Sequence, residues 1–539
     1  MKNTFKIISA VAAIVVGLAS CVKDLDVNPI DPNVVQEFNQ EAVFAKIYGT
    51  LGLTGQTGPD GDGDVDGLDE GTSSFYRMMW ELNEFPSDEV WWVWGDVGVT
   101  NVRACTWNSS NDLVKGLYSR LYFDITLCNL FLKETNGAGD ENTIKQRAEV
   151  RFIRALNYYY LLDMYGEGVP FATEVGVVPM PITRADLYKY VIDELKDIES
   201  QMYADGAKPY YRADQVAAWL LLARIYLNAE VYTGTPDYNN AALYAGKVMT
   251  SSYTLAPEYK HLFMGDNDPL STVNLASQEI ILPIAQDGIE TENWGGAIFL
   301  VASSRISGMN FPGTSEQWSC ARSKKNLVEK FFPGITNSTT IKGDENSLPA
   351  IAADDRCLLV NQVKNDLDGV VYEATLLGGA QNGDGADGFG AGWGIAKFSN
   401  LKVNGEPARD AKFPDVDIPL LRIAEAYLTY AEAVYRGGTA ANGSALDAVN
   451  ALRTRAHADP CLALTEDYLL DEWAREFYYE GRRRTDLIRF NKFAGNVNYN
   501  WEGKGDTPAG QNVDAKYNLY PIPYSDLMAN PNLKPTQGF

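Results

Sequence analysis

The feature that most constrains the fold is a pair of helices in the middle of the chain. Residues 213–232 and 239–250 both place apolar side chains at helical spacing. The first helix carries the W-x2-L-(G/A)-x2-Y pattern of a tetratricopeptide helix, formed by Trp219, Leu222, Ala223 and Tyr226. Small residues on the facing sides let such helices approach closely, so the pattern predicts a tightly packed helical pair.

A second pair of the same kind is predicted far downstream, at residues 420–436 and 445–457. The segment between the pairs, residues 251–410, is rich in Gly, Asn, Asp, Pro and aromatic residues, with a short strand-like run at 279–285. Stacked helical pairs tolerate such an insertion only if it forms a layer on one side. We therefore expect a mostly α fold, with a tetratricopeptide-like helical-pair scaffold and an irregular, loop-rich ligand-binding layer.

Four further helices are predicted, and together with the two pairs they define the residue ranges that we expect for the fold. Amphipathic helices are predicted at residues 34–48, 113–133, 143–164 and 185–202. We expect one unit over residues 34–539. Its scaffold would comprise residues 34–250 and 415–495, and its ligand-binding layer residues 50–110 and 251–410.

The first residues resemble a bacterial lipoprotein leader. Lys2 and Lys6 precede an apolar run over residues 7–19, which is too short to span a bilayer as a helix. It ends in Leu-Ala-Ser-Cys at Cys21, which resembles a lipobox, with a free cysteine after an ordinary signal peptide as the alternative. We expect a signal peptide at 1–20, lipidation of Cys21 and a tether over 21–33, so that the protein is held on a membrane without crossing it.

Charge and motif content narrow the function. A net charge of −25 repels phosphate backbones, so nucleic acid is not an expected partner, whereas neutral ligands meet no such repulsion. The two histidines, His261 and His457, lie in no metalloprotease or triad motif. Glu476 and Glu480 lie one helical turn apart beside several arginines, which favours an ion-pair network over a metal site. A glycosidase needs two carboxylates across a cleft, and with 71 acidic residues in the chain counting does not exclude such a pair.

A tryptophan-rich stretch around residues 83–97 is the strongest binding signal. In an extended segment Trp92 and Trp94 share one face and Trp91 points to the other, although clustered tryptophans also fill cores. Trp294 and Trp318 lie in polar surroundings in the irregular layer. Aromatic rings stack on the apolar face of a sugar, and polar groups such as Asp69 and Arg77 bind its hydroxyls.

Three C-terminal segments carry a family resemblance, namely DIPLLRIAEAY at 417–427, DEWAREFYYEGRRR at 471–484, and YPIPYSD at 520–526 followed by NPN at 530–532. The chain resembles the SusD/RagB family of Bacteroidetes outer-membrane nutrient-binding lipoproteins. The resemblance covers essentially the whole chain and is strongest to the starch-binding type.

The resemblance implies a non-catalytic, lipid-anchored protein of the outer membrane that faces the exterior. It would capture starch or malto-oligosaccharides and deliver them to a SusC-like TonB-dependent transporter. The implied α-glucan site comprises an arc of Trp92, Trp94, Trp294 and Trp318, with Asp69 and Arg77 as polar contacts. No cofactor is required by this function. A calcium site that involves Asp268 with Asp415 or Asp417 is implied by the same resemblance.

Two positions depart from the starch-binding pattern. Trp294 stands where a tyrosine is expected, which keeps a ring and removes a phenol hydroxyl, and Val97 stands where an asparagine is expected. These departures leave open a binder of a different glycan. The other alternative is a secreted glycan-degrading hydrolase of the same utilisation system.

Overall fold

Three long helices form the first half of the scaffold. The computed structural model describes residues 38–304, 313–364, 369–376 and 391–539. The helices are α5 (Asp112–Glu134), α6 (Glu141–Tyr160) and α7 (Arg184–Ile198), and α6 packs against both α5 and α7. Side chains of Asn111, Asp140 and Thr183 accept hydrogen bonds from backbone N–H groups in the first turns and so fix where these helices begin. The helices predicted at these positions are confirmed.

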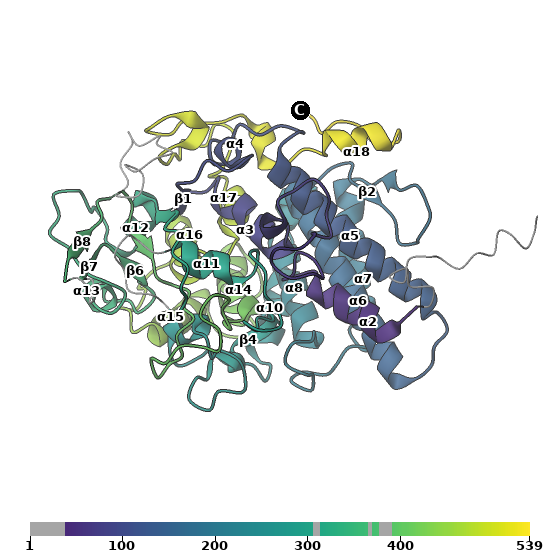
Figure 1. The fold of residues 1–539 in the computed structure, drawn as a ribbon, viewed down its shortest axis with the longest axis horizontal. Helices are drawn as coiled ribbons and strands as arrows, with labels where there is room; N and C mark the ends of the chain where they lie inside the picture. Colours follow the sequence, from purple (N-terminus) through teal and green to yellow (C-terminus); the bar gives the residue numbers. More distant parts are fainter. Residues whose placement is uncertain (1–37, 305–312, 365–368, 377–390) are drawn as a thin grey trace, which may run out of the picture. The chain divides into compact units, whose positions relative to one another are not determined.

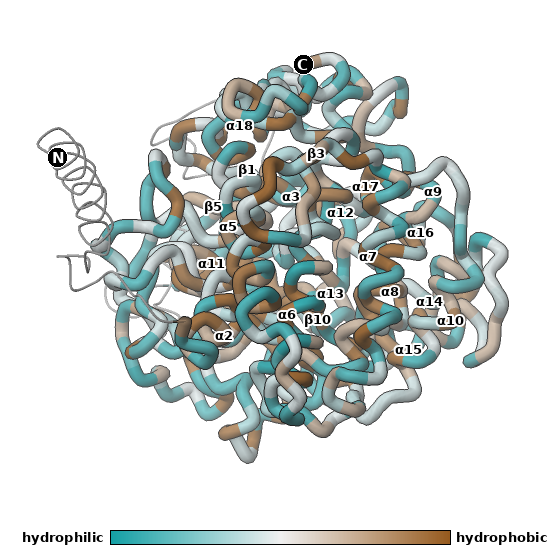
Figure 2. Tube along the Cα trace, turned by 90° about the vertical axis from the view of Figure 1, so that its right-hand side faces the viewer, coloured by the Kyte–Doolittle hydropathy of each residue, from teal (hydrophilic) through white to brown (hydrophobic). Residues whose placement is uncertain are grey.

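The two predicted helical pairs stack on each other. The first is α8 (Gln215–Leu227) with α10 (Tyr238–Met249), joined through α9 (Ala229–Thr233), and the second is α14 (Ala424–Tyr435) with α15 (Ala445–Arg455). Helix α10 packs against both α8 and α14, as Figures 1 and 2 show. Ala223 and Ala431 are fully buried, as expected for small residues between close helices. The mostly α scaffold of helical pairs is therefore confirmed.

The strands are short and form five two-stranded antiparallel sheets in the described part of the chain. In the sheet with the longest strands, β4 (Ile280–Ile284) pairs with β10 (Ile418–Arg422). Strand β4 lies within the strand-like run predicted at 279–285. The others pair β1 (Val90–Trp92) with β5 (Ala321–Ser323), β2 (Pro170–Phe171) with β3 (Met180–Pro181), β6 (Leu359–Val360) with β9 (Gly394–Ile395), and β7 (Gln362–Lys364) with β8 (Val371–Glu373). Sheets of this size need the surrounding helices for their stability.

The structure differs from the predicted loop-rich segment at 50–110, because it places a buried helix there. Every residue of α3 (Phe75–Glu84) is buried, and α3 packs against α5 and α17 (Arg483–Arg489), as Figure 1 shows. Arg77 and Glu81 of this helix form an ion pair, with Nε 2.9 Å from Oε1, and the Glu84 carboxyl accepts a 2.8 Å hydrogen bond from the Gly481 N–H. Buried charges are tolerated when they are paired in this way.

The remaining helices are short. They are α2 (Gln40–Gly49), α4 (Val99–Arg103), α11 (Ala297–Ser303), α12 (Lys325–Phe331), α13 (Leu348–Ala352), α16 (Glu466–Phe477) and α18 (Tyr524–Ala529). Residues 44–539 form one compact unit. In the part of the chain that the structure describes, no helix has the length and apolar character needed to cross a membrane.

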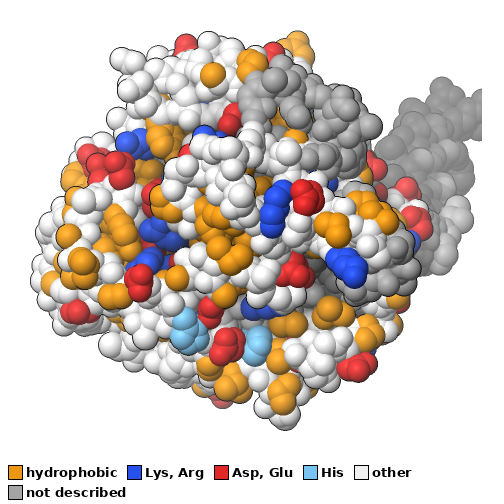
Figure 3. All heavy atoms as spheres, turned by 90° about the vertical axis from the view of Figure 1, so that its left-hand side faces the viewer, with side chains coloured by type: hydrophobic (Ala, Val, Ile, Leu, Met, Phe, Trp, Pro, Cys, Tyr) orange, Lys and Arg blue, Asp and Glu red, His pale blue; other side chains and the backbone are white. Residues whose placement is uncertain are grey.

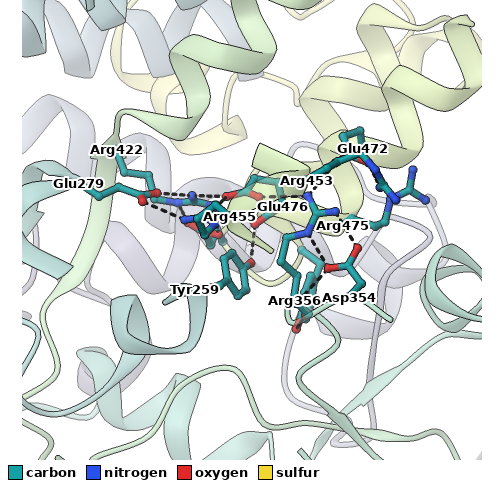
Figure 4. Close-up of polar contacts among 12 residues, drawn as sticks. Tyr259, Glu279, Asp354, Arg356, Arg422, Arg453, Arg455, Glu472, Arg475 and Glu476 are labelled. Carbon is teal, nitrogen blue, oxygen red and sulfur yellow. Dashed lines mark hydrogen bonds and ion pairs between the residues drawn. The ribbon is translucent and has the colours of Figure 1, made fainter. Parts of the chain in front are cut away.

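A buried ion-pair network joins segments that are distant in sequence (Figure 4). Glu476 on α16 contacts Arg356, Arg422 and Arg455. Glu472, one turn earlier, lies 2.8 Å from Arg356, and the cations around it lower its pKa to about 2 despite burial. The prediction that Glu476 and Glu480 belong to an ion-pair network is confirmed, because Glu480 is paired with Lys397 and Arg422.

Candidate functional site

The structure brings three of the predicted tryptophans together from distant segments. The ring centroids of Trp94 and Trp318 lie 5.8 Å apart with an angle of 35° between the ring planes. Trp318 lies 6.0 Å from Trp294, with planes at 42°. Trp294 in turn contacts the ring of Phe413 at 5.1 Å. The successive ring planes are tilted against each other, so the three tryptophans, which we call the aromatic arc, do not form a flat platform.

This arc lines a pocket with a volume of about 940 Å³. Its walls are the loop at 59–72, the start of α3, residues 94–99 and the first residues of α5. Five of the six predicted site residues line it, namely Asp69, Arg77, Trp94, Trp294 and Trp318. An apolar platform with a few polar groups in a pocket of this size is typical of a small-molecule or oligosaccharide site.

The prediction that Trp92 offers a ring face to a ligand is wrong for this structure. Its side chain has 0% exposure and packs against Phe85 at 5.2 Å and Trp80 at 6.3 Å. The alternation argument fails because all residues from Val90 to Val93 are buried, so both faces of the segment are covered. Trp92 instead supports Trp94, whose ring meets it edge-on at 6.0 Å. Trp91 is buried, as predicted.

Arg77 and Asp69 are held in fixed positions beside the arc. Arg77 is 7% exposed, and its guanidinium donates hydrogen bonds to Glu81 at 2.9 Å and to the carbonyls of Gly71 and Trp294 at 3.1 and 3.4 Å. Asp69 is exposed and accepts hydrogen bonds from the backbone N–H and the hydroxyl of Thr72, both at 3.2 Å. The pocket thus places one positioned cation and one accessible carboxylate next to aromatic rings.

Two glycines allow the Trp294 segment to reach α3. A Cβ on Gly71 would lie 2.6 Å from the Cβ of Trp294, and one on Gly295 would lie 2.6 Å from the Ser74 hydroxyl oxygen. The Ser74 hydroxyl donates a 2.7 Å hydrogen bond to the Gly295 carbonyl. Because a side chain at either position would push the segments apart, these glycines are needed for the close approach.

Several residues that line the pocket or contact its rings were not predicted from the sequence. The Trp294 indole N–H donates to Asp60 at 3.4 Å, and the ammonium group of Lys412 lies 4.2 Å from the ring centroid of Trp294. Glu70 also lines the pocket, and burial together with the charges of Asp69 and Asp60 raises its pKa to about 7. Val97 is 75% exposed at the rim. The only sequence signal for Glu70 was that it follows Asp69, which was a predicted site residue. No sequence signal pointed to Asp60 or Lys412.

The residues expected to bind calcium do not form a complete site. Among the described residues, no group of three or more His, Cys, Asp or Glu side chains is arranged to hold a metal ion. Asp415 is paired with Arg409 at 3.0 Å. Asp417 is buried, its Oδ2 has no hydrogen-bond partner in the described structure, and burial with the charges of Asp268 and Asp415 raises its pKa well above the usual range. The calcium site therefore stays a prediction.

The two histidines lie near each other on one face, with acidic side chains beside them (Figure 3). His457 Nδ1 lies 2.6 Å from Asp355, and this contact raises the pKa of His457. Neither histidine is among the described residues that line the pocket. The predicted signal peptide, the lipidation site Cys21 and the tether lie outside the residues that the structure describes.

Solved structures share this fold over nearly its whole length. A SusD superfamily protein from Parabacteroides distasonis aligns with a TM-score of 0.67 at 20% identity, over 93% of this chain and 100% of that one. Surface glycan-binding protein A from Bacteroides thetaiotaomicron, solved in complex with laminarihexaose, aligns with a TM-score of 0.66 at 18% identity, over 92% and 98% of the two chains. At these identities the likeness shows the fold alone.

Sequence comparison identifies the family. A model described as "SusD family" matches residues 302–539, and one described as "Starch-binding associating with outer membrane" matches residues 72–227. The protein named "Starch-binding protein SusD" of Bacteroides thetaiotaomicron is 42% identical over 545 aligned residues, which cover 98% of this chain and 97% of that protein. A "SusD-like protein" of Bacteroides ovatus is 24% identical over 72% of this chain and 69% of its own length. The chain belongs to the SusD family, as its C-terminal motifs predicted.

Proposed function

We propose that the protein binds α-glucan, as starch or malto-oligosaccharides, without cleaving it. The observation that carries this proposal is the non-coplanar aromatic arc of Trp94, Trp318 and Trp294, whose successive planes differ by 35° and 42°. A helical α-1,4-glucan presents its sugar faces along a curve, whereas a flat chain would need coplanar rings. The 42% identity to a protein named for starch binding supports the same ligand class.

Affinity electrophoresis tests this proposal. The purified protein is run through gels that contain amylopectin, dextran or xylan, and we expect retardation by amylopectin alone. Absence of retardation by amylopectin would overturn the starch assignment.

Binding of a different glycan is the second candidate. The exposed Val97 and the ring of Trp294 differ from the starch-binding pattern, and a protein of the same fold was solved with laminarihexaose. Laminarin is therefore included as a fourth gel. Retardation by laminarin and not by amylopectin would favour this candidate.

Incubation with maltoheptaose separates a binder from a hydrolase. We expect the chromatogram of the oligosaccharide to be unchanged after prolonged incubation with the protein. A hydrolytic activity that produces shorter oligosaccharides would overturn the non-enzymatic assignment, provided that it co-purifies with the protein and is absent from a Trp94→Ala variant.

The cellular role that we propose is capture at the cell surface and delivery to a SusC-like TonB-dependent transporter. The leader that ends at Cys21 supports a lipid anchor in the outer membrane, and the description of the second family model supports outer-membrane association. In cells, Cys21→Ala should release the protein from the membrane fraction, and the wild-type protein should be sensitive to external protease. Co-purification of a TonB-dependent transporter with the tagged protein would test the partner.

Calcium binding at Asp268, Asp415 and Asp417 is a separate proposal, supported by the unpartnered carboxylate oxygen of Asp417. A cation bound only by the folded state raises the melting temperature by mass action. We expect Tm to rise with calcium chloride relative to EDTA, and this rise to disappear in Asp268→Asn. An equal Tm in both solutions would contradict a calcium site.

A further inference from the structure

The pocket that contains the aromatic arc is strongly acidic. Six carboxylates line it, namely Asp60, Asp69, Glu70, Glu81, Asp96 and Asp112. Among the described lining residues, Arg77 is the only one with a basic side chain, and its charge is matched by Glu81 at 2.9 Å. Lys412 adds one ammonium group over the Trp294 ring. The carboxylates therefore outnumber the cations around the platform.

Three of these carboxylates are also oriented by hydrogen bonds from neighbouring groups. Asp60 accepts from the indole N–H of Trp294 at 3.4 Å, and Asp96 accepts from that of Trp92 at 3.3 Å. Asp69 is fixed by its hydrogen bond from the Thr72 N–H at 3.2 Å. The three carboxylates belong to exposed residues beside the rings. Their charges thus act at the place where a stacked sugar would lie.

We propose that these carboxylates make the pocket select uncharged or cationic glycans and exclude glycans that carry uronate or other anionic groups. This inference rests on the proposed function, because it assigns the charge preference of the same glycan site. Like charges concentrated at a partly desolvated cleft repel an anion more strongly than the same charges spread over an open surface. Neutral hydroxyls meet no such repulsion, and they can donate hydrogen bonds to the same carboxylates.

The test uses three ligands of nearly equal shape. They are maltoheptaose, maltoheptaose with its primary C6 hydroxyls oxidised to carboxylates, and 6-amino-6-deoxy-maltoheptaose. Dissociation constants are measured by isothermal titration calorimetry with the full mature chain at 20 mM and 500 mM NaCl. At low salt we expect the carboxylated ligand to bind about tenfold or more weakly than maltoheptaose and the amino ligand to bind more tightly. Both differences should shrink at high salt because the Debye length is about 4 Å there.

Substitutions that remove charge and keep shape identify the cause. The double variant Asp96→Asn with Asp112→Asn should reduce the ratio of the carboxylated to the neutral dissociation constant several-fold at 20 mM NaCl. Glu141→Gln is the matched control, because Glu141 is an exposed acid at the start of α6 that does not line the described pocket. It should leave the ratio unchanged.

The outcomes separate this inference from the proposed function. If maltoheptaose itself fails to bind, the proposed function is overturned. If maltoheptaose binds and the carboxylated ligand binds equally well at low salt, only the charge selectivity is overturned. A ratio that changes neither with salt nor in the double variant would show that size excludes the carboxylated ligand, which also overturns the electrostatic inference.

Discussion

At the scale of single residues, neighbouring tryptophans have different roles. Trp94 and Trp318 are partly exposed and line the pocket, whereas Trp92 is fully buried next to them. A ring that stacks on a ligand is needed for affinity, and a ring enclosed by other side chains is needed for stability. Substitution by alanine therefore distinguishes the two roles.

Trp94→Ala and Trp318→Ala should each weaken glucan retention several-fold, since a stacked indole contributes on the order of 1 kcal/mol or more. Neither should change the denaturant midpoint appreciably. Trp92→Ala is the comparison variant and should lower the free energy of unfolding by about 3–5 kcal/mol. Affinity electrophoresis and urea unfolding measure the two effects. A large loss of stability in Trp318→Ala would place that ring in the core.

A second residue-scale prediction concerns the buried pair Glu84 and Glu89. Burial raises the pKa of Glu84 to about 7, and burial with the neighbouring charge of Glu84 raises the pKa of Glu89 well above its usual value. The folded state therefore binds protons that the unfolded state has lost above about pH 4.5, so stability falls as pH rises from about 5. Glu89→Gln, which resembles the protonated acid, should remove up to about 1.4 kcal/mol per pH unit of that slope.

Urea unfolding between pH 5.5 and 8 measures the slope, and the exposed Glu141→Gln serves as the control. An unchanged slope in Glu89→Gln would mean that this carboxyl is ionised in the folded state at neutral pH.

At the scale of elements, the site depends on how the Trp294 segment meets the start of α3. A methyl group at Gly71 would lie 2.6 Å from the Cβ of Trp294. Gly71→Ala should therefore displace Trp294 from the arc and weaken glucan binding by about fivefold or more, which is within the worth of one stacked ring. Gly139→Ala is the control, because nothing lies within 4 Å of a Cβ there. Equal affinities of the two variants would show that the contact at Gly71 is not needed for binding.

The elements that the sequence could predict are those whose residues follow a local pattern, and the elements that it missed depend on contacts between distant segments. The helical pairs followed from local sequence, because α10 and α15 bury one face at helical spacing, and α8 and α14 carry apolar and small residues that are buried on most sides. Helix α3 was missed although Phe75, Met78, Met79 and Leu82 lie at helical spacing, because its charged face with Arg77, Glu81 and Glu84 is buried as well, and only tertiary contacts reveal that. The position of Trp92 failed for a related reason, since it depends on β1 pairing with β5 more than two hundred residues away.

The candidate site shows the same limit. The tryptophans and the pair Asp69 and Arg77 were predicted from residue chemistry and family resemblance. The carboxylates that line the pocket were not predicted as a group. Asp60 and Asp96 come together only when the loop at 59–72 and the segment at 94–99 meet around the pocket. Contacts of this kind depend on tertiary structure and leave no periodic signal in the sequence.

At the scale of the whole molecule, the buried network around Glu476 links the helical scaffold to the loop-rich segments. Glu476 on α16 pairs with Arg422 on β10 at 2.7 Å and with Arg356 in the irregular region at 3.2 Å, and it also contacts Arg455 on α15. Glu279, next to β4, pairs with two of the same arginines, both at 2.9 Å. Removing one carboxylate would leave buried guanidinium groups without compensation.

Glu476→Gln should therefore lower the free energy of unfolding by about 3–5 kcal/mol, the usual effect of removing one partner from a buried ion pair. Since none of these residues lines the pocket, the folded variant should bind glucan with unchanged affinity when it is assayed well below its melting temperature. Glu466→Gln, an exposed acid at the start of the same helix, is the control and should change stability by less than about 1 kcal/mol. Weaker binding by the fully folded Glu476→Gln protein would show that the network also sets the geometry of the aromatic arc. The stability of the scaffold and the geometry of the site would then be coupled.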